Sequence, residues 1–91
     1  QNDLYVFAVD LQDGHFRAHG ISPQLVNSDG MVLLDPQDTP IIQQMIAQLQ
    51  SSQRGELDYS WRNPITGQVE KKHTFFRKID KTLVAVGFFT R

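Results

Sequence analysis

The chain has 91 residues, which suffices for one domain with a single modest core. It carries 9 Lys and Arg against 10 Asp and Glu, so it lacks the basic excess of a protein that binds nucleic acid or an anionic membrane surface. The absence of cysteine excludes disulfides and thiolate metal sites, and no apolar run approaches the ~20 residues of a membrane span.

Two strands joined by a turn are predicted at the start. Residues 4–9 (LYVFAV) form an unbroken apolar run, which is typical of a central strand covered on both faces. The pair Asp13-Gly14 indicates a tight turn, and residues 15–20 (HFRAHG) follow as a short partner strand. Strict alternation places three polar side chains on one face of this partner strand: His15, Arg17 and His19.

The middle of the chain is predicted to be an irregular crossover that ends in a helix. Residues 20–38 contain turn signals and one helical turn at SPQLV, with Ser22 as cap. A helix is predicted over 40–51, capped by Asp38 or Thr39, with Pro40 at its first position. One apolar stripe recurs at helical spacing: Ile41, Ile42, Met45, Ile46 and Leu49.

Everything after Gly55 is predicted to be strand. Leu57, Tyr59 and Trp61 alternate with polar residues, the segment NPITG turns the chain, and residues 68–79 form a long second arm. The last segment, TLVAVGFFT, is apolar on both faces and is predicted to be central.

These elements predict an α+β domain with a five-stranded antiparallel sheet in the PAS-like order 2-1-5-4-3. The helical crossover covers one face of this sheet. The apolar character of the first and last strands indicates that something else covers the second face. A preceding helix outside this sequence and a second copy of the chain are both open, and we expect a homodimer.

The histidines do not predict a metal site, and no motif predicts catalysis. His15 and His19 are four residues apart on a strand, roughly 13 Å, which is too far for one zinc ion. No nucleophile elbow, zinc-protease helix or phosphate-binding glycine loop occurs. We therefore expect a protein that is not an enzyme and that carries no cofactor or metal.

The chain resembles the single Cache domains, the short extracytoplasmic sensor domains of bacterial chemoreceptors, histidine kinases and diguanylate cyclases. The similarity begins at YVFAVDLQDGHFRAHG and continues through SPQLV and LLDPQDTPIIQQMI. It is sharpest at G-x-x-x-Y-x-W, N-P-x-T-G and K-x-x-F, and it closes on VAVGFF. The family usually has Tyr where Phe75 stands, and the loop NSDG at 27–30 lacks the family's G-x-N pattern.

The resemblance implies a sensor module that binds a small organic acid or amino acid between the sheet and the crossover. Lys72 is the expected cation for a carboxylate, since a desolvated ammonium regains hydrogen bonds from such a ligand. The other predicted ligand-binding residues are Trp61, Tyr59, His19, Arg17 and Phe75. A solvated Lys72, an exposed His19 and a Trp61 that belongs to the core stay open as alternatives.

We interpret the 91 residues as one domain, 1–91, of a larger membrane-anchored signalling protein of the bacterial periplasm or cell exterior. Membrane contact is expected only through segments outside this sequence, and no nucleic-acid partner is expected. The preferred hypothesis is a sensing domain that relays carboxylate binding to a cytoplasmic output domain. The alternative is a ligand-free PAS-like module for dimerisation or partner docking.

Overall fold

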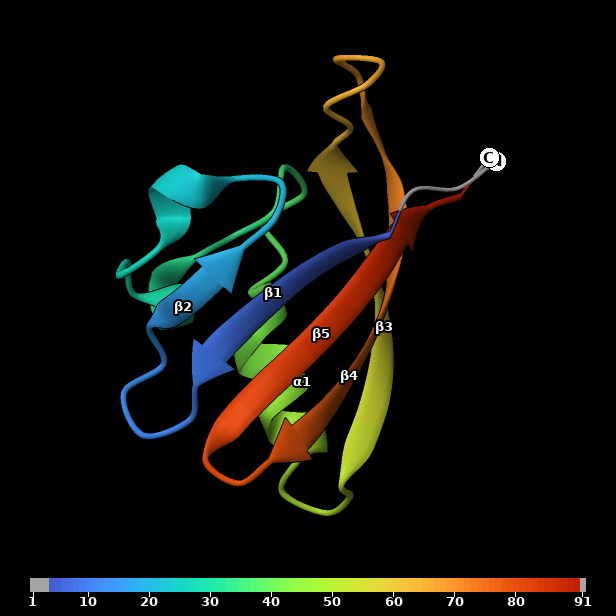
Figure 1. Ribbon diagram of the computed structural model, residues 1–91. Coiled ribbons are helices and arrows are strands. Elements are labelled where there is room, and N and C mark those ends of the chain that lie inside the picture. Colours follow the sequence, from blue (N-terminus) through green and yellow to red (C-terminus); the bar gives the residue numbers. More distant parts are fainter. Residues whose placement is uncertain (1–3, 91) are drawn as a thin grey trace.

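A computed structural model describes residues 4–90 as one five-stranded antiparallel sheet with a crossover on one side (Figure 1). The strands are β1 (Tyr5–Asp10), β2 (Phe16–His19), β3 (Arg54–Arg62), β4 (Val69–Ile79) and β5 (Thr82–Phe89). Their order is β2-β1-β5-β4-β3, with every neighbouring pair antiparallel. The predicted fold class and strand order are therefore confirmed.

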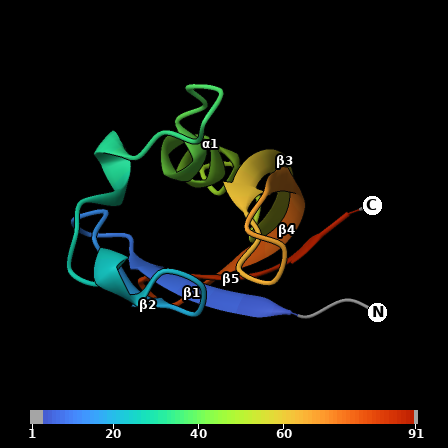
Figure 2. The same cartoon turned by 90° about the horizontal axis from the view of Figure 1, so that it is seen from above.

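The crossover between β2 and β3 holds two short 3₁₀ turns, η1 (Pro23–Leu25) and η2 (Gly30–Val32), and the helix α1 (Ile41–Gln48). Viewed from above, α1 and this crossover lie on the same side of β1 and β5 (Figure 2). No helix among residues 4–90 is both long and apolar enough to cross a membrane.

The predicted cap of the helix α1 is wrong, because the cap position is Pro40, which has no side-chain donor or acceptor. Ser22 does occupy the cap position of η1, with Pro23 following it as predicted, but its side chain makes no capping hydrogen bond. The carboxylate of Asp35 accepts the backbone N–H of Thr39 instead, so it pairs a backbone donor just before the helix begins.

The core lies between the sheet and α1. Alternate residues of the central strands point into it, as the period of two in a strand requires. The predicted stripe of α1 is confirmed, since Ile41, Ile42 and Met45 are buried and Leu49 follows them. Aromatic rings from β1, β2, β3 and β4 complete the cluster: Phe7, Phe16, Tyr59 and Phe76.

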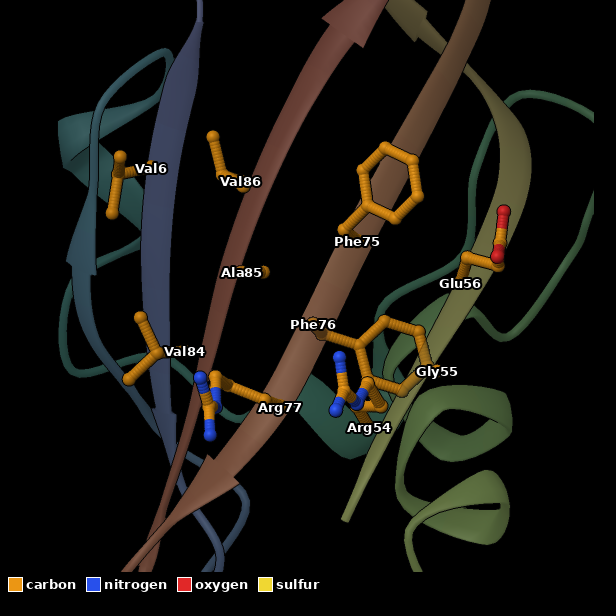
Figure 3. A pocket seen from close by; sticks show the side chains of 10 residues that line it. All are labelled: Val6, Arg54, Gly55, Glu56, Phe75, Phe76, Arg77, Val84, Ala85 and Val86. Carbon is orange, nitrogen blue, oxygen red and sulfur yellow. The ribbon is translucent and has the colours of Figure 1, made fainter. Parts of the chain in front are cut away.

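The other face of the sheet, called the outer face below, is open among the described residues. Val6 of β1 and Phe75 of β4 point there and are 52% and 45% exposed. No element of residues 4–90 covers this face of the first strand, and the expectation that a preceding helix or a second copy of the chain covers it stays a prediction. The apolar side chains that motivated this expectation are on the outer face, where Val84 and Val86 of β5 lie between β1 and β4 (Figure 3).

Candidate functional site

Lys72 is the most unusual side chain of the core. It lies on β4 between Tyr59 of β3 and Phe89 of β5, points inward, and is only 1% exposed. Its Nζ lies 5.4 Å from the ring centre of Phe7, 5.5 Å from that of Tyr59 and 5.9 Å from that of Phe89. Three aromatic faces therefore surround the ammonium, and their quadrupoles attract it.

This ammonium has no anionic partner among residues 4–90. No carboxylate forms an ion pair with it and no oxygen there accepts its protons. Burial lowers the pKa of Lys72 from its usual 10.5 to about 8. At neutral pH the side chain is therefore a charged donor with no acceptor among residues 4–90, although its Nζ is not fully sealed from solvent. Such a donor suits a site for an anion.

His19, at the end of β2, belongs to the same aromatic cluster. Its ring stacks on Phe7 at 5.3 Å and on Trp61 at 6.0 Å. Burial first, and the charge of Lys72 second, lower the pKa of His19 to about 4, so the ring is neutral at pH 7. Its Nδ1 accepts the backbone N–H of Ser22 at 2.9 Å, which assigns the proton to Nε2 as a free donor.

Tyr59 supplies a third donor next to Lys72. Its hydroxyl oxygen accepts a hydrogen bond from Thr74 Oγ1 at 3.1 Å, which leaves the phenolic proton for another acceptor. Burial raises the pKa of Tyr59 well above its usual 10.0, so the phenol stays protonated. Lys72, His19 and Tyr59 together form a buried group of donors, called the lysine cluster below.

A hollow of about 560 Å³ lies beside the lysine cluster, between the crossover and the β3–β4 hairpin. Trp61 lines it and also packs edge-on against Tyr59 at 6.2 Å, so this indole separates the hollow from the cluster. Lys72 is not among its lining residues, since the rings of Phe7, Tyr59 and Phe89 cover the ammonium.

Asp35 joins the crossover to the sheet at the rim of this hollow. Its Oδ1 accepts the backbone N–H groups of Gln37 and Thr39 at 2.9 and 2.8 Å, and its Oδ2 accepts that of Ser60 on β3 at 3.0 Å. Burial raises the pKa of Asp35, but these donors, Ser60 first, lower it by more, and the net shift is downward. Asp35 is thus ionised and links the crossover to β3.

Comparison with known families decides what this arrangement belongs to. The sequence model of the family described as single Cache domain 2 matches residues 1–88. The chain belongs to this family. Cache domains of this kind are ligand-binding sensor modules without catalytic activity. No curated protein matches the chain.

Solved structures of chemotaxis proteins share the fold of this Cache domain. A periplasmic sensor domain of a chemotaxis protein superposes with a TM-score of 0.87 at 22% identity, over 98% of this chain. A methyl-accepting chemotaxis protein from Vibrio parahaemolyticus gives 0.83 at 25% identity, over 96% of the chain. A Cache chemosensory domain studied for carboxylic acid recognition gives 0.85 at 21% identity, over 97%. The chain spans only 62%, 59% and 60% of these three.

Four of the six predicted ligand-binding residues meet in the Cache domain, and two do not. Lys72, Tyr59, His19 and Trp61 are neighbours. Phe75 lies on the outer face beside the ring of His73, because it is three residues from Lys72 on one strand and alternation sends it to the opposite side. Alternation applied to Phe75 in the sequence predicts this placement.

Arg17 was predicted to share a face with His19, and this is wrong. Ala8 pairs with Ala18 but Val9 pairs with Phe16, so Arg17 is the extra residue of a β-bulge. Its guanidinium is exposed and binds the carboxylates of Asp10 and Asp13 at 3.1 and 2.9 Å. The bulge is also what turns His19 inward beside Phe7.

Sequence reasoning missed the other components of the site. In the sequence Phe7 and Phe89 are predicted only as strand residues, and Asp35 is predicted only as part of a turn. The Asp-Pro pair followed by Thr39 was the available signal for Asp35, since an Asp before a turn often accepts backbone N–H groups. No group of three or more His, Cys, Asp or Glu side chains among residues 4–90 is arranged to hold a metal ion.

Proposed function

We propose that this Cache domain is the extracytoplasmic small-molecule sensing domain of a longer, membrane-anchored bacterial receptor. It binds a small carboxylate and relays that binding to a cytoplasmic output domain. The observation that carries the proposal is the buried ammonium of Lys72, which has no anion beside it but has the donors of His19 and Tyr59 nearby. A carboxylate that reaches this cluster makes the missing hydrogen bonds in a place with little water.

The similar structures support the location and the ligand class. One is a periplasmic sensor domain of a chemotaxis protein, and another concerns recognition of carboxylic acids by a Cache domain. Both are under 25% identical to this chain, so the case for its own ligand rests on the lysine cluster.

Organic acids without an amino group fit the cluster better than amino acids do. An amino acid presents an ammonium group as well as a carboxylate, and the ammonium needs an acceptor. Asp35 is the only buried carboxylate among residues 4–90, and three backbone N–H groups already occupy it. The lysine cluster offers donors, which suit a carboxylate and repel a second cation.

The route to Lys72 passes through the hollow between the crossover and the hairpin. A ligand that enters there displaces the indole of Trp61 from its contacts with His19 and Tyr59. The bound acid then touches β4 through Lys72 and the start of the crossover through His19, whose Nδ1 holds the Ser22 N–H. A ligand that contacts both walls favours one relative position of them, which is the requirement for a population shift.

Isothermal titration calorimetry with matched pairs of acids tests this function. Propionate and alanine differ by one amino group, and pyruvate carries a ketone oxygen where alanine carries that amino group. We expect propionate or pyruvate to bind at pH 7 and alanine to bind at least about tenfold more weakly. Equal binding of acid and amino acid contradicts the preference for organic acids, and binding of neither contradicts the carboxylate function.

Lys72→Met and Lys71→Met form the matched pair of variants. Both remove one lysine charge from β4, but Lys71 is exposed on the outer face and Lys72 is buried. Lys72→Met is expected to abolish binding, while Lys71→Met leaves it unchanged. Loss of binding in both, with the fold intact by circular dichroism, means that general charge and not the cluster attracts the acid.

The ligand-free docking module stays a second candidate because the rings of Phe7, Tyr59 and Phe89 close over Lys72 and the outer face is apolar. The two functions differ in one measurement. A sensing domain gains thermal stability in millimolar organic acid, because a ligand that binds only the folded state stabilises it. A closed module does not respond to any acid.

A further inference from the structure

We propose that Lys72 captures a 2-oxo acid through a reversible imine between its Nζ and the ketone carbon of the ligand. This rests on the carboxylate function proposed above and narrows its ligand class to acids with a carbonyl next to the carboxylate. Such an acid presents two groups that suit the lysine cluster. Its anion accepts hydrogen bonds from His19 and Tyr59, and its electrophilic carbon suits a buried amine.

Lys72 lies in the surroundings of a nucleophilic amine and not in those of an ion-paired lysine. Its side chain is buried, and no carboxylate among residues 4–90 forms an ion pair with it. Three aromatic rings, from β1, β3 and β5, surround its Nζ. Lysines that form imines with carbonyl compounds are desolvated in this way, whereas the other lysines of the chain are exposed: Lys71, Lys78 and Lys81.

The neutral amine is the form that attacks a carbonyl carbon. Burial lowers the pKa of Lys72 to about 8, so at pH 7 about one tenth of this side chain is neutral. The neutral fraction of a lysine with the ordinary pKa of 10.5 is roughly 300-fold smaller. The Nζ is not fully sealed from solvent, so a small ligand that displaces the indole of Trp61 reaches it.

The donors near Lys72 favour a carbonyl directly beside the carboxylate. Tyr59 pairs with Lys72 across β3 and β4, and His19 stacks on Phe7, whose ring centre lies 5.4 Å from the Nζ. Both donors therefore belong to the aromatic cluster that holds the amine. In a 2-oxo acid the ketone carbon is bonded to the carboxylate carbon, about 1.5 Å away. A carboxylate bound by His19 and Tyr59 therefore brings the ketone carbon next to the amine.

Imine formation at Lys72 needs only the acid and water. The neutral Nζ adds to the ketone carbon, and one of its two protons passes to the carbonyl oxygen to give a carbinolamine. The C–O bond then breaks, and the hydroxyl group leaves as water with the second Nζ proton while the C=N bond forms. The imine nitrogen takes up a proton from solvent, so a positive charge stays among the three rings and beside the ligand carboxylate.

Reductive trapping with the 91-residue chain tests the imine. Sodium cyanoborohydride reduces an imine to a stable secondary amine, and mass spectrometry of proteolytic peptides then locates that amine. With pyruvate at pH 7, we expect Lys72 to be trapped at least about tenfold faster than Lys71, Lys78 or Lys81. Methyl pyruvate has the ketone but no carboxylate, so the preference for Lys72 over Lys71 is expected to fall about tenfold. Propionate competes for the lysine cluster and is expected to slow trapping at Lys72 alone.

Calorimetry and trapping together separate failure of the imine from failure of the carboxylate function. Propionate that binds in calorimetry, while pyruvate is not trapped at Lys72, overturns the imine and leaves the carboxylate function standing. Equal trapping rates at Lys72 and Lys71 overturn the imine as well, and so does an equal preference for Lys72 with methyl pyruvate. Lys71→Met is the matched control and is expected to keep the trapping at Lys72. If neither acid binds and pyruvate is not trapped, both proposals fail.

Discussion

Replacing Lys72 by Met is expected to stabilise the Cache domain while it removes ligand binding. The buried ammonium has a pKa of about 8 against 10.5 in an unfolded chain, a difference of about 2.5 pH units. At about 1.36 kcal/mol for each unit, burial of the charge costs about 3 kcal/mol at pH 7. Met fills a similar volume without a charge, but it loses the attraction to the three rings, so the net gain is about 2 kcal/mol.

Urea unfolding of wild type and Lys72→Met at pH 7 measures this gain directly. For a domain of this size 2 kcal/mol corresponds to a rise of roughly 10 °C in Tm. Lys71→Met, on the exposed side of the same strand, is the control and is expected to change stability by less than about 0.5 kcal/mol. A Lys72→Met protein that is less stable than wild type refutes the reasoning, because the buried ammonium of Lys72 then stabilises the fold.

The pH dependence of the same pair gives an independent check. Between pH 8 and 10.5 the unfolded chain holds the Lys72 proton and the folded chain does not, so wild-type stability rises with pH. The expected rise is about 2 kcal/mol between pH 8 and 9.5 relative to Lys72→Met. The series stops at 9.5 because Tyr59, whose pKa is raised in the fold, begins to ionise in the unfolded chain near 10 and lowers stability. Parallel curves for the two proteins contradict the lowered pKa.

Three further results are expected. The pKa of His19 is about 4 in the folded chain and 6.5 in the unfolded chain, so the free energy of unfolding falls as pH drops from 6.5 toward 4. NMR titration of the His19 ring should therefore give a midpoint near 4, and a midpoint above 6 contradicts its burial. Asp35→Ala leaves buried N–H groups unpaired and should lower the free energy of unfolding in urea by about 2–4 kcal/mol. Asp35→Asn should cost less because it keeps one acceptor oxygen, and an Asp35→Ala protein of unchanged stability means that Asp35 does not link the crossover to β3. Gly87→Ala places a Cβ 2.5 Å from Thr74 Oγ1 and 2.7 Å from Lys72 Cε, so it should lower stability by about 1–3 kcal/mol and weaken acid binding. Unchanged stability together with unchanged acid binding argues against this close approach.

The outer face of the sheet is apolar and uncovered within residues 4–90. The apolar runs LYVFAV and TLVAVGFFT each supply both faces of a strand, and only one face is covered by α1 and the crossover.

The amino-acid sequence by itself determined the elements and their order. Apolar periodicity fixed the strands and the stripe of α1, the NPITG turn fixed the register of the long hairpin, and two fully apolar strands required each other as neighbours. Tyr59 and Trp61 share a face because alternation over a regular strand is a local rule. The same rule failed at Arg17, where a bulge shifts the phase of β2.

Only the tertiary structure decided the environment of each group. Lys71 and Lys72 are the same residue type in adjacent positions, yet one is exposed and the other is enclosed by rings from β1, β3 and β5. The charge of Lys72 that helps to lower the pKa of His19, and the backbone N–H of Ser60 that Asp35 accepts, likewise come from residues far away in the chain. Local pattern specifies which way a side chain points, whereas desolvation and charge depend on what distant strands bring to meet it.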